Sequence, residues 1–246
     1  MSRSRSFGAV AELYDRYRPP PPEGLAEYLG PLRGLDALDV AAGTGLVTRY
    51  LESLGARVTC VEPDPQMRAV LVRRSPAARV RAGVAEDLPV DDASVDVALT
   101  SSAWHWFTQP NAAQEFARVL RDGGRLFILG NGPDREHGWL ERLAEAAHAA
   151  SLPTPAAATR HAAEAHEDLT DPFVDVGTFE IHWTWRRTVE ELLGLLQTYS
   201  AAIVLPDEER ASLVERARTE LLRSAPEGVL DVAMLTHGVR ATRRAR

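Results

Sequence analysis

Short apolar runs and amphipathic segments alternate along the first half of the chain. The β-rich apolar runs predict strands near 36–41, 57–61, 79–83, 94–100 and 124–130. Segments with apolar residues at helical spacing predict helices between most of these strands, near 45–54, 64–74 and 111–120. Strands that alternate with helices in this way are typical of a parallel sheet with helical crossovers. The pattern therefore predicts an α/β fold with a doubly wound sheet.

The pattern changes after residue 132. A helical insertion is predicted to begin there, because apolar residues recur at helical spacing, namely Leu140, Leu143, Ala144 and Ala147. Two later segments read as strands, at 178–185 and 229–236. Helices are predicted between these strands, near 188–199 and 207–223. We expect the insertion and the late helices to form a helical cap over a pocket.

Size and charge narrow the class of protein. A chain of 246 residues with 45% hydrophobic residues can bury one substantial core, so we expect a single elaborated domain. A formal net charge of −7 gives no overall attraction to phosphate backbones or to anionic membranes. We therefore expect neither a nucleic acid nor a membrane as partner.

Cysteine use and the absence of long apolar runs also carry predictions. The single cysteine, Cys60, excludes an intrachain disulfide and offers no zinc cluster, so no metal is expected. No apolar run approaches the roughly 20 residues that span a bilayer, and residues 1–6 precede no signal-like hydrophobic segment. We expect a cytoplasmic protein that is a monomer or a homodimer.

The most informative motif is the segment Ala37–Gly45. A short apolar strand passes an acidic residue, Asp39, and enters a tight glycine turn that opens a helix. Glycines at Gly43 and Gly45 let the backbone approach a ligand, and the helix N-terminus points N–H groups at it. A dinucleotide fingerprint would need Gly or Ala where the chain has Thr48, and no Walker loop is present. The segment predicts a cradle for a nucleotide-type cofactor.

A second carboxylate, Glu62, follows the glycine turn at a spacing suited to binding a ribose. Glu62 ends the second predicted strand, 19 residues after Gly43, where a carboxylate can accept hydrogen bonds from two ribose hydroxyls. Further motifs follow in order: Ala85–Pro89, the apolar strand Val95–Thr100, and a helix, glycine turn and strand over Glu115–Leu129.

At this point the chain resembles the class I S-adenosylmethionine-dependent methyltransferases, especially the small-molecule branch with an N-terminal lid. The resemblance includes Phe7–Pro20, which looks like the N-terminal segment of that branch, and Ala103–Phe107, which looks like its signature after the fourth strand. It implies a Rossmann-like, seven-stranded, mostly parallel sheet with an antiparallel edge strand. It also implies four parts, namely a lid at 1–30, a cofactor-binding core at 31–131, cap insertions at 132–227 around a late strand, and a last strand and tail at 228–246.

The resemblance implies S-adenosylmethionine as cofactor and a set of residues that hold it. The cradle and the strand ends supply Asp39, Ala41, Gly43, Thr44, Gly45, Glu62, Pro63, Met67, Glu86, Asp87, Leu88 and Ser101. Tyr14 and Arg18 resemble lid residues that close over the cofactor, with Arg18 meeting its carboxylate. Either Glu86 or Asp87 would accept from the adenine amine, and position favours Asp87. Ala41 stands where the family has its first glycine, which predicts a loop slightly further from the methionine part.

The acceptor side centres on His105, which follows the fourth strand between two tryptophans. Its imidazole either removes the proton of the acceptor or serves as a structural hydrogen-bonding group. The strand ends in Thr100–Ala103 and lacks the Asn/Asp-Pro-Pro-Tyr/Phe motif of enzymes that methylate amines of bases or glutamine. These observations predict methyl transfer to an oxygen, nitrogen or carbon of a small biosynthetic metabolite. The alternatives are a relative that uses the same cofactor for a non-methylating reaction such as cyclisation, or a non-catalytic binding partner.

Overall fold

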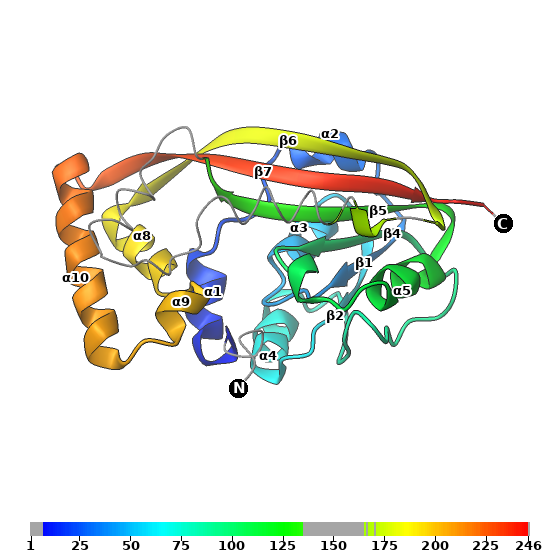
Figure 1. Ribbon diagram of the computed structural model, residues 1–246, viewed down its shortest axis with the longest axis horizontal. Coiled ribbons are helices and arrows are strands. Elements are labelled where there is room, and N and C mark those ends of the chain that lie inside the picture. Colours follow the sequence, from blue (N-terminus) through cyan, green and yellow to red (C-terminus); the bar gives the residue numbers. More distant parts are fainter. Residues whose placement is uncertain (1–6, 135–164, 166, 170, 246) are drawn as a thin grey trace. The chain divides into compact units, whose positions relative to one another are not determined.

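The computed structural model of this chain describes residues 7–134, 165, 167–169 and 171–245 (Figure 1). The chain forms two compact units, each made of three segments. The larger unit contains Pro20–Asn131, Ala158–Ile181 and Thr236–Arg246, and the smaller unit contains Met1–Pro19, Gly132–Ala157 and His182–Leu235.

The larger unit carries the alternating strands and helices that the sequence predicts. In chain order its elements are α2 (Leu25–Leu29), β1 (Asp36–Val40), α3 (Leu46–Ser53), β2 (Arg57–Val61), α4 (Pro65–Arg74), β3 (Arg79–Arg81), β4 (Val95–Ser101), η3 (Trp104–Trp106) and α5 (Asn111–Val119). Three long strands then pass through a unit boundary: β5 (Leu120–Pro133), β6 (Phe173–Thr188) and β7 (Val229–Arg243).

The strands form one seven-stranded sheet in the order β3-β2-β1-β4-β5-β7-β6. The pairs from β3 to β5 are parallel, with Val40 opposite Val61 on one side and opposite Thr100 on the other. Antiparallel strands form the β7–β6 edge. The strand order reverses between β1 and β4, and in open α/β sheets ligands bind outside the carboxyl ends of the strands at such a point. The predicted fold class is confirmed.

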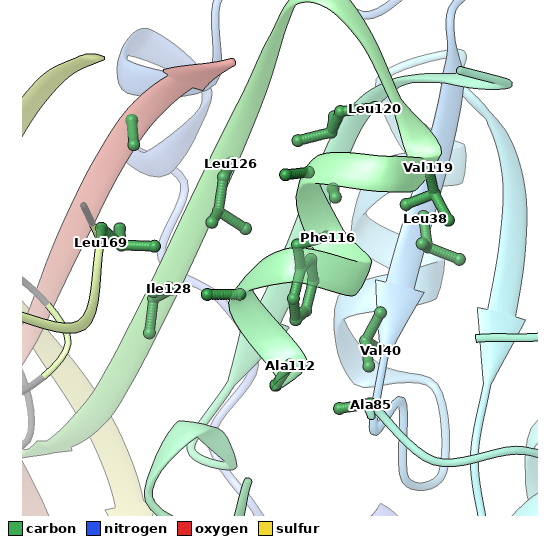
Figure 2. Close-up of a cluster of buried hydrophobic side chains, with 14 of the residues drawn as sticks. Leu38, Val40, Ala85, Ala112, Phe116, Val119, Leu120, Leu126, Ile128 and Leu169 are labelled. Carbon is green, nitrogen blue, oxygen red and sulfur yellow. The ribbon is translucent and has the colours of Figure 1, made fainter. Parts of the chain in front are cut away.

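Apolar side chains cover both faces of the parallel strands. Leu38 and Val40 of β1 pack in a buried cluster with Phe116 of α5, which Figure 2 shows between α5 and the strands. Ala37 belongs to a second buried cluster, with Leu25 of α2 and other residues. Because successive strand residues point to opposite faces, the apolar residues of β1 serve both clusters. This packing holds the carboxyl ends of β1 and β4 in place.

The smaller unit is mainly helical. Its helices are η2 (Phe7–Val10), α1 (Ala11–Tyr17), α8 (Val189–Leu196), α9 (Ser200–Ile203) and α10 (Asp207–Ser224). Helix α8 begins with a capping box, in which the Thr188 hydroxyl accepts from the Glu191 N–H and the Glu191 carboxylate accepts from the Thr188 N–H. Leucines of α8 and α10 pack in a separate buried cluster with Trp185.

Some predicted boundaries differ from the structure. The strand predicted at 124–130 begins at Leu120, because Leu120 already pairs with Val95 across an irregularity in the register. The late strands predicted at 178–185 and 229–236 extend to Phe173–Thr188 and Val229–Arg243. Pairing with a neighbour continues both beyond the apolar pattern that signals them. The helical insertion predicted from Leu140 lies outside the described residues.

Candidate functional site

The glycine turn after β1 has the backbone conformation of a ligand cradle. Ala41, Gly43 and Gly45 have φ values of 56°, 58° and 88°, all in the left-handed region. A Cβ on Gly45 would come within 2.3 Å of the Leu71 side chain, so the turn also lies tightly against α4. Ala41 adopts a conformation that costs an alanine about 1 kcal/mol. Such local strain is often found at functional turns.

Glu62 joins this turn to the end of β2. Its Oε2 accepts from the Gly43 N–H at 2.8 Å, and its Oε1 accepts from the Asp64 N–H at 2.9 Å. The side chain is buried, which raises the pKa of Glu62 above its usual range, although both backbone hydrogen bonds act in the opposite direction. A carboxylate oxygen has room for a second donor, so each oxygen retains capacity for a hydroxyl of a ligand.

Asp39 lies below the turn in a small polar network. It is 1% exposed, and its Oδ2 accepts from the Thr48 hydroxyl at 2.7 Å. The same Thr48 oxygen lies 3.2 Å from the Cys60 sulfur. Burial raises the pKa of Asp39 to about 7, the Thr48 hydrogen bond lowers it, and the charge of Glu62 raises it. Burial and the neighbouring Asp39 also raise the pKa of Cys60, which makes a reactive thiolate there unfavourable.

Two buried hydroxyls at this edge of the sheet lack partners. Thr44 Oγ1 lies in the cradle turn and Thr100 Oγ1 near the end of β4, and neither has a hydrogen-bond partner in the part of the chain that the structure describes. Thr100 is the register partner of Val40, so it lies at the β1–β4 reversal. Buried polar groups without partners commonly mark a missing ligand or water. The Thr44 and Thr100 hydroxyls therefore fit a polar ligand at this edge of the sheet.

The turn after Glu62 is held by its own cap. Asp64 Oδ1 accepts from the N–H groups of Gln66 and Met67, and Pro65 occupies the first position of α4. Met67 is buried on this helix, and Pro63 precedes the cap. The two predicted cofactor contacts, Pro63 and Met67, therefore lie on either side of the Asp64 cap.

The loop after β3 contains the candidate adenine contacts. Glu86 Oε1 accepts from the Thr108 N–H at 2.6 Å, whereas the Asp87 side chain is exposed. The Leu88 N–H donates to Glu115 Oε2 at 2.7 Å. The adjacent Arg118 guanidinium holds the pKa of Glu115 below its usual range and donates to the Leu88 carbonyl. Glu86 and Leu88 are thus engaged with the protein.

The segment after β4 contains the candidate acceptor residues. Ser101 is the last residue of β4, and His105 is exposed within η3. The His105 ring centre lies 4.6 Å from that of Trp106, whose side chain is 40% exposed. Trp104 is buried instead, and its indole N–H donates to Asp168 at 2.8 Å. Of the two tryptophans, only Trp106 presents a ring beside His105.

Tyr14 and Arg18 belong to the smaller unit and contact each other there. The Arg18 guanidinium carbon lies 5.0 Å from the Tyr14 ring centre and 4.6 Å from that of Tyr199. Arg18 also donates from Nε to the Thr198 hydroxyl and from Nη2 to the Thr198 carbonyl. This geometry gives Arg18 a structural role within its unit. That the pair closes over a cofactor stays a prediction.

Sequence reasoning missed three residues that organise the larger unit. Thr48 entered only as a mismatch to a dinucleotide motif, yet it bonds the buried Asp39. A polar residue on the apolar face of its helix was the available signal. Glu115 and Arg118 on α5 hold the Leu88 backbone, and only their spacing of three residues along a helix signalled a pair.

Among the residues that the structure describes, no group of three or more His, Cys, Asp or Glu side chains could hold a metal ion. In the same part of the chain, no helix is both long and apolar enough to cross a bilayer.

Similarity to known proteins extends beyond these motifs. Residues 38–128 match the family described as the methyltransferase domain. An uncharacterised methyltransferase of Mycobacterium tuberculosis is 35% identical over 223 residues, which cover 91% of this chain and 88% of that protein. An uncharacterised methyltransferase-like protein of Schizosaccharomyces pombe is 30% identical over 224 residues, covering 87% of each. The solved structure of a proposed type II methyltransferase from Anaeromyxobacter dehalogenans is 25% identical, with a TM-score of 0.70 over 92% of this chain and 98% of that one.

Proposed function

This chain belongs to the class I S-adenosylmethionine-dependent methyltransferases, and on that premise we propose that it methylates a small organic acceptor with S-adenosylmethionine. The observation that carries the proposal is the link between the glycine turn and Glu62. One carboxylate accepts from both Gly43 and Asp64, and unpartnered hydroxyls lie at the same sheet edge. A cradle of this kind suits a ligand with ribose hydroxyls and a charged amino acid part.

The residues of the larger unit divide the work of holding the cofactor. Glu62 would accept from the ribose hydroxyls through the lone pairs that the backbone leaves. Asp39 would pair with the ammonium group, directly or through water. Asp87 would accept from the adenine amine, because its exposed carboxylate is available while Glu86 is bonded to Thr108.

The protein needs to position the acceptor and the cofactor more than it needs to activate the methyl donor. When bound, S-adenosylmethionine offers a methyl group on a sulfonium, which is already an activated donor. The task of the chain is to hold a nucleophile in line and to exclude water. His105 would take the proton of an acceptor alcohol, and Trp106 offers a face against which a flat acceptor can stack. The net charge of −7 supports a small acceptor over a nucleic acid.

Calorimetric titration with S-adenosylmethionine and S-adenosylhomocysteine tests the proposal. We expect both to bind the wild type, and Glu62→Ala to weaken both by at least about tenfold, because a buried carboxylate that accepts from backbone donors is lost. Glu27→Ala is the matched control, since Glu27 is exposed on α2. Binding justifies a screen of acceptors by mass for a 14-dalton gain. A folded wild type that binds neither compound would refute the proposal.

A further inference from the structure

Two hydrogen bonds and the loop between them link Glu62, at the end of β2, to the segment that contains His105. The Glu62 N–H donates to the Arg81 carbonyl at the end of β3. The loop that begins there packs tightly, since a Cβ on Gly83 would come within 2.7 Å of Pro89. From this loop, Glu86 reaches across to accept from Thr108. The path therefore joins two loops that are separate in sequence.

The far end of this path is the junction between η3 and α5. Thr108 follows Phe107, whose N–H bonds the Trp104 carbonyl, and the Thr108 carbonyl accepts from Ala112 in α5. The Thr108 N–H is the donor that Glu86 satisfies, at 2.6 Å. A hydrogen bond to an ionised carboxylate is stronger than one between neutral groups. Thr108 lies three residues after His105, so the hydrogen bond to Glu86 fixes the backbone at the end of the segment that contains His105.

The part of the loop that follows Glu86 is held by α5. Arg118 donates to the Leu88 and Val90 carbonyls, to Asp92 and to Glu115. Glu115 in turn accepts from the Leu88 N–H. Hydrogen bonds hold Arg81 before Glu86 and Leu88 after it, so a displacement at the cofactor site can reach Glu86 through this loop.

We propose that Glu86 is a positioning residue that couples occupancy of the cofactor site to the His105–Trp106 segment. The proposal rests on the proposed function and deepens it. The His105–Trp106 segment, which faces the acceptor, would become ordered only after the cofactor has bound. Glu86 would contact neither the cofactor nor the acceptor. Asp87, its exposed neighbour, provides the contrast, because it is the residue that we expect to meet adenine.

Hydrogen exchange measured by mass spectrometry on peptides that cover residues 102–110 tests the coupling, with S-adenosylhomocysteine as the probe. In the wild type we expect the compound to slow exchange in this segment. In Glu86→Ala we expect Thr108 to exchange about tenfold faster, because its acceptor is gone. The added compound should then no longer slow exchange there, while its Kd stays within about threefold of wild type. Glu86→Gln, which keeps an acceptor oxygen, should restore the wild-type pattern, and Asp87→Ala should leave Thr108 exchange unchanged in the absence of the compound.

The outcomes separate this proposal from the proposed function. A Kd raised at least tenfold in Glu86→Ala with Thr108 exchange unchanged would overturn the positioning role, because Glu86 would then be a direct contact. Protection that survives in Glu86→Ala would overturn the coupling. If the wild type does not bind the compound, the proposed function fails and the coupling fails with it. Faster Thr108 exchange in unliganded Glu86→Ala would still establish that Glu86 holds the Thr108 N–H. Glu86→Asp, shorter by one methylene, replaces the alanine variant if that variant does not fold, with the same expected losses.

Discussion

The buried carboxyl of Asp39 contributes to the pH dependence of this protein's stability, and Asp39→Asn removes that contribution. Asp39 is 1% exposed and has the Thr48 hydroxyl as its hydrogen-bond donor at 2.7 Å. Burial raises its pKa from 3.8 to about 7. The folded state therefore holds a proton that the unfolded state releases near pH 4. Asparagine has nearly the same shape, and its carbonyl oxygen can still accept from Thr48.

The sign and size of the effect follow from this pKa. Below about pH 4 the carboxyl is neutral in both states, so wild type and Asp39→Asn should be equally stable. Between about pH 4 and 7 the wild type loses about 1.4 kcal/mol of unfolding free energy per pH unit from this group, because only the folded state keeps the proton. The total approaches about 4 kcal/mol above pH 7 and then stays constant.

Urea unfolding followed by circular dichroism, at pH 5, 6, 7 and 8 without ligand, measures this difference. We expect the Asp39→Asn advantage to grow with pH and to level off above pH 7. Asp91→Asn serves as the control, because Asp91 is exposed and its loss should leave the wild-type curve unchanged. Parallel pH curves for wild type and Asp39→Asn, or a less stable variant at pH 8, would refute the reasoning. The stabilised variant should bind S-adenosylmethionine more weakly at pH 8, since an amide carries no charge for the ammonium group.

Three further predictions follow from single contacts. Gly45→Ala should lower the free energy of unfolding by about 2–4 kcal/mol, because alanine is strained at φ 88° and its Cβ would meet Leu71; thermal melting measures this. His105→Ala should lower kcat by about 100-fold or more on an acceptor identified by mass, with unchanged S-adenosylhomocysteine affinity; full turnover would exclude a general base. Arg18→Lys should destabilise the smaller unit by about 1–2 kcal/mol, because lysine cannot reproduce both bonds to Thr198; limited proteolysis should then cut that unit faster than in wild type.

Local patterns predicted the parallel part of the sheet well. The strand predicted at 57–61 is Arg57–Val61, and the helix predicted near 64–74 is Pro65–Arg74. Both have strong local signals: β-branched residues in the strand, and an Asp-Pro start in the helix. Local signals also placed Glu62 at the end of β2, 19 residues after Gly43, but they did not show that its carboxylate contacts the glycine turn.

Contacts between distant segments were beyond the reach of such patterns. That Glu86 bonds Thr108 depends on two loops 22 residues apart meeting in space. Arg18 likewise carries a pattern suited to a carboxylate, yet in its unit it bonds Thr198, 180 residues away. A side chain shows what it can bind, and the fold decides which partner is within reach.

The sequence by itself determined the α/β class, the position of the cradle and the chemistry of its carboxylates, because these depend on residue type and short spacing. Tertiary structure alone decided the state of those carboxylates. Asp39 has a raised pKa because strands and helices from both sides bury it, and Glu62 accepts from the Gly43 N–H because β1 and β2 are parallel neighbours. Burial and long-range pairing are properties of the folded chain, and no local stretch of residues encodes them.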